Sequence, residues 1–291
     1  MMQDPGIRTM SFLTSITAAI LALGLVLGLP TTAALGAGEQ RTAKNVNFSF
    51  EGPFGTFDRG QLQRGYLVYE QLCSACHSMN LMSYRNLGQP GGPEFSEAEV
   101  QAIAANRQVT DGPDDNGEMF QRPGVASDRF VAPFPNQQAA RAANAGVLPP
   151  DLTLITKSRA GWEGSLATFY TTTLWSDIGG PEYVYSVLTG YEQTPPELAD
   201  QQPDIAHYNP YFTAAPWIAM PPPLTDGAVE YGDGTEATVD QMARDVSAFL
   251  AWAAEPTLEE RKRIGFQVLL YMAVLTVLLF LIKNMIWSRL H

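Results

Sequence analysis

An uninterrupted apolar run constrains this 291-residue chain more than any other sequence feature. Residues Ile264 to Ile282 carry no charge, and as an α-helix they would span about 28 Å, close to the thickness of a bilayer's hydrocarbon core. Lys283 and Trp287 follow, and such residues favour the membrane interface. The run therefore predicts a membrane-spanning helix; a buried core helix is the weaker alternative.

A second apolar run lies near the start of the chain, from Phe12 to Leu29, and Arg8 precedes it. Pro30 and a stretch of small residues follow. This pattern predicts a secretory signal peptide over residues 1–37. A retained transmembrane helix is the alternative.

Charge is distributed unevenly between these runs. Residues 39–260 carry 12 Lys/Arg and 29 Asp/Glu, whereas residues 261–291 carry five bases and no acid. The net charge of −12 argues against a nucleic-acid partner, and two cysteines cannot form a disulfide-rich scaffold. We therefore expect an acidic, water-exposed domain over residues 38–258. An anchor helix with a short tail should occupy residues 259–291.

The water-exposed domain is expected to be mainly α, with short helices joined by long loops, because Gly and Pro clusters interrupt it repeatedly. One helix should begin after Asp58 and a second after Thr238, each behind a capping residue. A third, capped by Thr257, should run into the membrane. Residues 111–145 are expected to form a surface excursion. The first two helices should cross with Tyr69 against Phe249, and Met242 should face the core.

The most informative motif is Cys73-Ser74-Ala75-Cys76-His77. This C-x-x-C-H pattern is typical of covalent c-type haem attachment, because two thiols three positions apart reach both vinyl groups while the histidine binds the iron. A zinc site would need four ligands, and the only other histidines are His207 and His291. A thioredoxin-like redox pair would need a βαβ pattern, which is absent from the sequence around the motif.

A haem iron in an electron carrier requires a sixth ligand, and methionine raises its reduction potential. Met220 precedes Pro221-Pro222-Pro223, and a rigid proline segment could hold its thioether in place. Spacing alone does not decide between Met220 and His207, and Met119 in an acidic loop is a weaker candidate.

Taken together, these features resemble the cytochrome c1 family of quinol–cytochrome c oxidoreductases. The resemblance covers nearly the whole chain after residue 37. Besides the C-x-x-C-H motif and Arg261-Lys262-Arg263, it rests on segments at residues 149–152, 182–191, 209–212, 220–224, 245–250 and 252–256. It implies a cytochrome c-like haem domain with large loop insertions and one C-terminal membrane helix.

The resemblance also implies site residues. His77 and Met220 would be the axial iron ligands, and Cys73 and Cys76 would hold one haem c covalently. Arg159 would neutralise a haem propionate. Other positions that match haem-lining residues of the family are Asn144, Pro149, Pro150, Tyr183, Phe212, Ile218 and Pro223. Residues 161–178 depart from the family pattern and place the alignment of Arg159 in question.

The implied function is transfer of single electrons from an iron–sulfur subunit to a soluble or anchored cytochrome c, beside a cytochrome b. The alternatives are a membrane-anchored carrier or oxidase subunit outside that complex, a haem enzyme or sensor with an open iron site, and a structural subunit. The expected location is the bacterial inner membrane, with the haem domain in the periplasm. The positive-inside rule slightly favours the opposite orientation, because three bases precede the span and two follow it. An export signal and haem c both favour the periplasm, and long domains are translocated largely regardless of charge.

Overall fold

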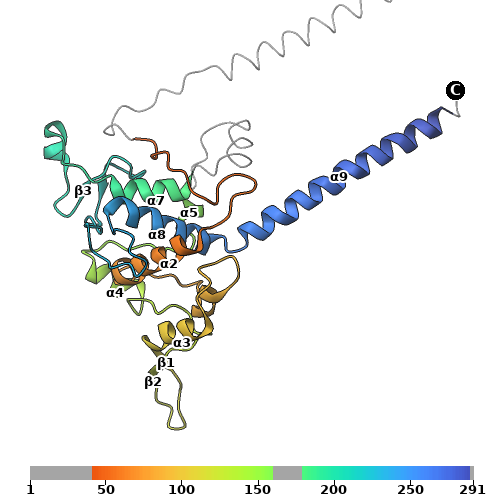
Figure 1. Ribbon diagram of the computed structural model, residues 1–291. Coiled ribbons are helices and arrows are strands. Elements are labelled where there is room, and N and C mark those ends of the chain that lie inside the picture. The colour runs from red at the N-terminus through yellow and green to blue at the C-terminus, as the bar shows by residue number, and fades with distance from the viewer. Residues whose placement is uncertain (1–40, 160–178, 289–291) are drawn as a thin grey trace, which may run out of the picture. The chain divides into compact units, whose positions relative to one another are not determined.

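The computed structural model describes residues 41–159 and 179–288 and is mainly helical, as predicted (Figure 1). The predicted signal peptide and the departing segment at 161–178 lie outside these residues. A π-helical turn, Tyr69–Cys73, and two 3₁₀ segments, Tyr84–Gly88 and Pro196–Gln201, accompany the helices. The α-helices are α2 (Arg59–Val68), α3 (Glu97–Ala105), α4 (Gln137–Ala143), α5 (Ile155–Ser158), α7 (Gly180–Thr189), α8 (Val239–Ala254) and α9 (Leu258–Trp287).

Strands in the described part of the chain form two short antiparallel pairs. Strand β1 (Gln108–Asp111) pairs with β2 (Phe120–Pro123), and β3 (His207–Tyr208) pairs with β4 (Trp217–Ile218). The first pair closes a hairpin within the predicted surface excursion. That excursion was predicted too broadly, because the ring of Phe130 is buried 4.8 Å from that of Tyr84.

Side-chain caps begin the two principal helices where the sequence predicts them. Asp58 accepts a hydrogen bond from the Gln61 amide at 2.9 Å, and Thr238 accepts one from the Gln241 amide at 3.1 Å. The prediction for Thr257 was wrong in one respect: α9 does begin after it, but its side chain makes no capping bond. The chain turns directly from α8 into α9, so the Thr257 backbone lacks the extended conformation that capping requires.

Helices α2 and α8 cross at Gly65, the point of closest approach. A Cβ atom at Gly65 would lie 2.1 Å from the Asp245 carbonyl oxygen and 2.7 Å from the Phe249 Cβ. Asp245 is fully buried at this crossing, and its carboxylate accepts hydrogen bonds from Arg64 at 2.9 Å and Gln241 at 2.8 Å. The bonds compensate the cost of burying that charge.

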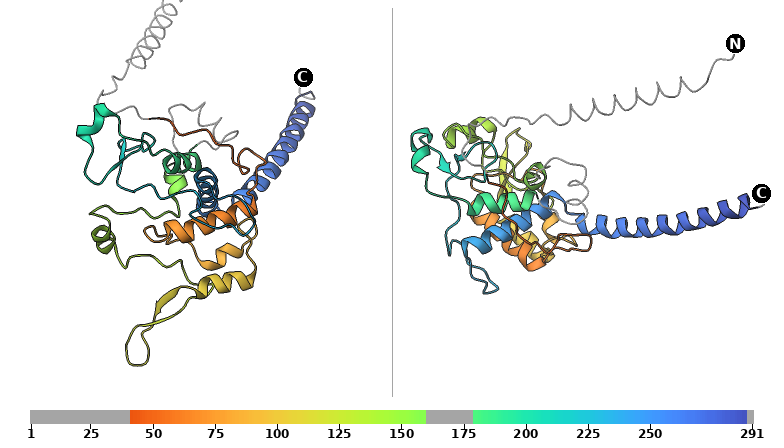
Figure 2. Two further views of the ribbon diagram at one scale, coloured as in Figure 1. Left: turned by 60° about the vertical axis from the view of Figure 1, so that its left-hand side comes forward. Right: turned by 90° about the horizontal axis from the view of Figure 1, so that it is seen from above.

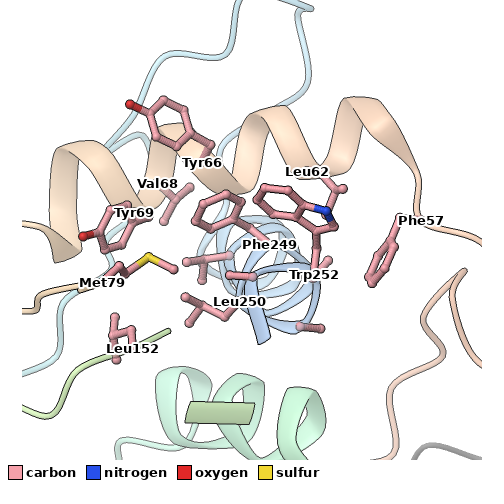
Figure 3. Close-up of a cluster of buried hydrophobic side chains, with 14 of the residues drawn as sticks. Phe57, Leu62, Tyr66, Val68, Tyr69, Met79, Leu152, Phe249, Leu250 and Trp252 are labelled. Atoms are coloured by element: carbon pink, nitrogen blue, oxygen red, sulfur yellow. The ribbon is translucent and has the colours of Figure 1, made fainter. Parts of the chain in front are cut away.

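Aromatic side chains fill the space beside the crossing (Figure 3). The ring of Phe249 lies 5.7 Å from Tyr66, 5.9 Å from Tyr69 and 5.7 Å from Trp252. The predicted contact between Tyr69 and Phe249 is therefore confirmed, and Met242 is fully buried as expected. Edge-to-face and tilted ring pairs of this kind add to the stabilisation from burial alone.

Helix α7 packs on the other side of α8, so α8 lies between α2 and α7 (Figures 2 and 3). Short helix α5 contacts both α7 and α8. Gly180, at the start of α7, allows this approach, since a Cβ there would lie 1.7 Å from the Thr156 carbonyl oxygen.

Helix α9 is the one helix among the described residues that is long and apolar enough to cross a membrane. Its apolar stretch is not buried against the rest of the protein. This agrees with the membrane-spanning helix predicted from the sequence.

The close crossing of α2 and α8 predicts that adding a methyl group at Gly65 destabilises the protein, whereas adding one elsewhere on α2 does not. Gly65→Ala should destabilise the protein by roughly 3 kcal/mol or more, because the backbone of α8 cannot yield as a flexible side chain would. Gly60→Ala is the matched control on the same helix, since its nearest atom would be 3.4 Å from the new Cβ. Melting temperatures measured by circular dichroism should fall for the first variant only. Equal melting temperatures would contradict this packing.

A buried carboxyl group predicts a pH dependence. Burial is the main cause that raises the pKa of Glu182 from 4.5 to about 7, and the adjacent Glu51 carboxyl contributes in the same direction. Folding therefore favours the protonated form, so stability should decline as the pH rises from about 4.5 to about 7. Glu182→Gln, which keeps an acceptor for the Gly179 amide, should flatten this decline. The check is a series of thermal melts from pH 5 to 8, and an unchanged slope in the variant would contradict it.

Candidate functional site

The C-x-x-C-H segment continues directly from α2 through the π-helical turn. Cys73 is the last residue of that turn, and its carbonyl oxygen accepts hydrogen bonds from the amides of Cys76 at 3.1 Å and His77 at 2.9 Å. Cys73 is half-buried, and burial raises the pKa of its thiol to about 12, whereas Cys76 is exposed. The turn thus places Cys73 and Cys76 directly before His77.

The orientation of His77 is set by one hydrogen bond. Its Nδ1 lies 2.8 Å from the carbonyl oxygen of Pro150, which can only accept, so Nδ1 is assigned as the donor. Burial lowers the pKa of His77, which favours the neutral ring. A neutral imidazole that donates through Nδ1 presents an unprotonated Nε2, the atom with which histidines commonly bind metals.

Asp151 fastens the Pro150 segment to the residues that follow His77. Its carboxylate accepts hydrogen bonds from the Asn80 amide at 2.7 Å and the Ser78 hydroxyl at 3.0 Å, and from the Thr153 amide at 2.9 Å. Partial burial acts to raise the pKa of Asp151, but these hydrogen bonds outweigh it and lower the pKa. The clamp therefore supports the carbonyl group that orients His77.

Met220 belongs to a small apolar cluster separate from the main core. The buried members are Tyr183 and Val187 of α7 with Ile218 of β4, and the half-buried members Tyr191, Phe212 and Met220 pack against them. Three predicted lining residues, Tyr183, Phe212 and Ile218, are thus brought together with Met220. The thioether sits in an apolar environment built largely on α7.

The segment that carries Met220 is fastened on both sides. Ile218 is buried in the apolar cluster, and Leu224 is buried in the main core. Between them, the Tyr191 hydroxyl donates to the Met220 carbonyl oxygen at 3.1 Å. The three prolines after Met220 restrict the backbone further. The sulfur atom is therefore presented from a rigid segment.

The remaining predicted residues occupy varied environments. Asn144 is the half-buried C-terminal cap of α4, and its side chain donates to the Ala140 carbonyl oxygen at 2.7 Å. Pro149 and Pro223 are half-buried, and Pro150 contacts His77 through its carbonyl group. Arg159 is exposed at the end of α5, the last residue before the undescribed segment.

The two competing ligands from the sequence, Met119 and His207, lie in different environments. Met119 is 58% exposed beside the β1–β2 hairpin, which is a poor environment for an iron ligand. His207 lies on β3 opposite Ile218, with its ring 6.5 Å from that of Tyr191. Across residues 41–159 and 179–288, no three His, Cys, Asp or Glu side chains form a group that could hold a metal ion. The zinc alternative therefore lacks a ligand set within that part of the chain.

Comparison with known proteins decides the family. The model of the cytochrome c1 family matches residues 48–290. This chain belongs to the cytochrome c1 family. It is 44% identical over 286 residues to a cytochrome c1 of Cereibacter sphaeroides, covering 92% of this chain and 94% of that protein. It is also 44% identical over 237 residues to a mitochondrial cytochrome c1 heme protein of Solanum tuberosum, covering 81% and 82%.

A third relative, cytochrome b/c1 of Bradyrhizobium diazoefficiens, is 45% identical over 281 residues. The match covers 95% of this chain but 40% of that longer protein. The cytochrome c1 resemblance read from the sequence is therefore confirmed for the family.

Three residues of this cytochrome c1 family member were missed as site residues by sequence reasoning. Asp151 and Tyr191 lie in segments that resemble the family, yet each acts on a distant part of the chain. Asp151 accepts a hydrogen bond from the Asn80 amide, 71 residues away, and Tyr191 donates one to the Met220 carbonyl oxygen, 29 residues away. The side chain of Val187 packs in the apolar cluster. The sequence Pro149-Pro150-Asp151 could have indicated the role of Asp151, because Asp side chains commonly accept hydrogen bonds from backbone amides at turns.

Proposed function

We propose that this chain is the membrane-anchored c1 subunit of a quinol–cytochrome c reductase, in which it transfers single electrons. One haem c, attached to Cys73 and Cys76, would be its cofactor. Membership of the family and the names of the relatives support the role, and the mitochondrial relative is named as a heme protein. The electron donor would be an iron–sulfur subunit and the acceptor a soluble or anchored cytochrome c.

The observation that carries this proposal is the His77–Pro150 hydrogen bond next to the two thiols. It leaves Nε2 of a neutral imidazole available as a proximal ligand, directly after the C-x-x-C spacing that haem attachment requires. The Asp151 clamp would keep the Pro150 carbonyl in place when the iron changes charge. These residues therefore suit the group that the family implies.

When bound, the haem supplies the one-electron chemistry, and the protein tunes it through ligands, burial and hydrogen bonds. Met220 would be the second axial ligand, since its thioether is held in an apolar cluster and its backbone is fixed by Tyr191. This environment favours Met220 over exposed Met119. His207 borders the same cluster through Ile218 and Tyr191, so the choice between Met220 and His207 is left to the experiment below. A thioether ligand stabilises ferrous iron and raises the potential.

Other side chains would exclude water from the haem and balance its charge. Tyr183, Phe212 and Ile218 already form an apolar surface beside Met220, and Asn144, Pro149, Pro150 and Pro223 would complete the lining. Arg159, exposed at the end of α5, would pair with a propionate.

The membrane arrangement follows from the division of the chain. Residues 1–37 would direct export and be removed, 38–258 would form the periplasmic haem domain, and 259–291 would anchor it in the inner membrane with a short cytoplasmic tail. Helix α9 supports the single anchor. In that position the chain would lie beside a cytochrome b and receive electrons from the iron–sulfur subunit.

Replacing the proposed ligand tests the function directly. Met220→Leu should retain covalent haem but lower the reduction potential by more than about 0.1 V, within the roughly 0.8 V range set by axial ligands. A fall of that size disfavours reduction by roughly 50-fold. Quinol–cytochrome c reductase activity of membranes should therefore drop, and the ferrous protein should bind carbon monoxide. Redox titration, activity assays and carbon monoxide difference spectra measure the three effects.

Met119→Leu is the matched control and should leave all three properties unchanged. If Met220→Leu keeps its potential and binds no carbon monoxide, Met220 is not the ligand, and His207 becomes the next candidate. If the potential falls while reductase activity persists, the chain does not carry electrons for that reaction.

A further inference from the structure

The loop that precedes α2 carries an exposed aromatic side chain at its tip. Phe54 is 75% exposed within Glu51-Gly52-Pro53-Phe54-Gly55. Gly52 has a φ of +68°, and a Cβ at Gly55 would lie 1.9 Å from the Glu51 carbonyl oxygen, so both glycines are required for this tight turn. The backbone thus presents Phe54 outward instead of into the core.

Three contacts fasten this loop to the first turns of α9. The Phe57 amide donates to Glu259 Oε1 at 2.8 Å, and Lys262 donates to the Phe50 carbonyl oxygen. The ring of Phe54 meets that of Phe266 edge to face, with the centroids 5.7 Å apart. Because residues 259, 262 and 266 share one face of the helix, the loop runs along α9 toward its apolar stretch.

The contact between Phe54 and Phe266 indicates how deep the loop would lie in the membrane. Phe266 is the third residue of the uncharged run and is itself 54% exposed. It lies about 4.5 Å along the helix axis beyond Arg263, the last charged residue before the run. If α9 spans a bilayer, that level would correspond to the boundary between lipid headgroups and acyl chains, where aromatic rings are favoured.

We infer that the Phe54 loop is a second membrane contact, inserted into the interfacial layer of the phospholipid bilayer beside α9. The inference rests on the proposed membrane anchoring of α9 and goes beyond it by adding an element of the water-exposed domain. Lipid is the expected partner of this loop, because the exposed Phe54 ring adjoins Phe266 and extends its apolar surface. The bilayer would cover Phe266, and it would therefore cover Phe54 as well. Arg263, 70% exposed on its side chain, stands at the level of the headgroup phosphates.

Two points of attachment would restrict rotation of the haem domain about its helical anchor. Glu259 also pairs with Arg59 at the start of α2, at 2.8 Å. The loop and α2 are therefore tied to the same turn of α9. The membrane contact would thus help to set the orientation of the haem-bearing helix relative to the bilayer surface.

Spin labels at three positions test the inference. Phe54→Cys, Leu278→Cys in the middle of the span and Phe120→Cys on the hairpin would each carry a nitroxide, in the full haem-loaded chain. The unmutated chain, whose two cysteines would be blocked by thioether bonds, gives the background. Each protein is reconstituted in vesicles of phosphatidylcholine and phosphatidylglycerol, and power saturation measures collision with oxygen and with a water-soluble nickel chelate.

Oxygen concentrates in lipid and the nickel chelate does not, so the ratio of oxygen to nickel accessibility rises with depth in the bilayer. The ratio at position 54 should lie between the ratios at positions 278 and 120. It should be at least about fivefold higher than the ratio at position 120. If 54 matches 120 while 278 reports hydrocarbon, the loop is in water and the inference fails although the anchor stands. If 278 also reports water, the anchor fails and the inference with it. A label at 54 shielded from both reagents would place protein there and overturn the lipid contact.

Discussion

The close crossing of α2 and α8 at Gly65 is the constraint on which the rest of the structure depends. It brings the Asp245 carbonyl oxygen to within 2.1 Å of where a side chain would begin, and only glycine allows this. The approach buries Asp245 between the helices, where Arg64 and Gln241 satisfy its carboxylate. Aromatic rings of both helices then fill the adjoining space. Because α2 continues into the C-x-x-C-H segment, the crossing also determines where the two sulfur atoms and His77 are presented.

Helix α8 connects the two groups of candidate ligands without supplying any ligand itself. On one side it packs against α2, which leads to His77, and on the other against α7, which contributes Tyr183 and Val187 to the cluster around Met220. Local hydrogen bonds then fix each candidate ligand: the Pro150 carbonyl orients the imidazole of His77, and Tyr191 holds the backbone of Met220. The packed helices thus position the segments that carry His77 and Met220, and hydrogen bonds from loop residues set the orientation within each segment.

Local signals in the sequence were sufficient for the helices and for the haem-attachment motif. The caps at Asp58 and Thr238, the apolar positions of α8 and the uncharged run of α9 each depend on residues within one element, so their interpretation held. What could not be predicted depends on distant segments. The apolar cluster around Met220 forms only when distant segments pack on α7, and Asp151 acquires its role only when residues 78–80 fold against it. Burial of Glu182 likewise follows from packing, because nothing in its neighbours along the chain marks an acid as buried.

The central claim is that His77 and Met220 are the two axial ligands of one covalent haem. Near-infrared magnetic circular dichroism of the oxidised, unmutated protein tests it most directly, because the charge-transfer band of low-spin ferric haem differs between histidine–methionine and bis-histidine ligation. The account predicts a band characteristic of histidine–methionine ligation. A bis-histidine band, or a high-spin spectrum with an open sixth position, would contradict it.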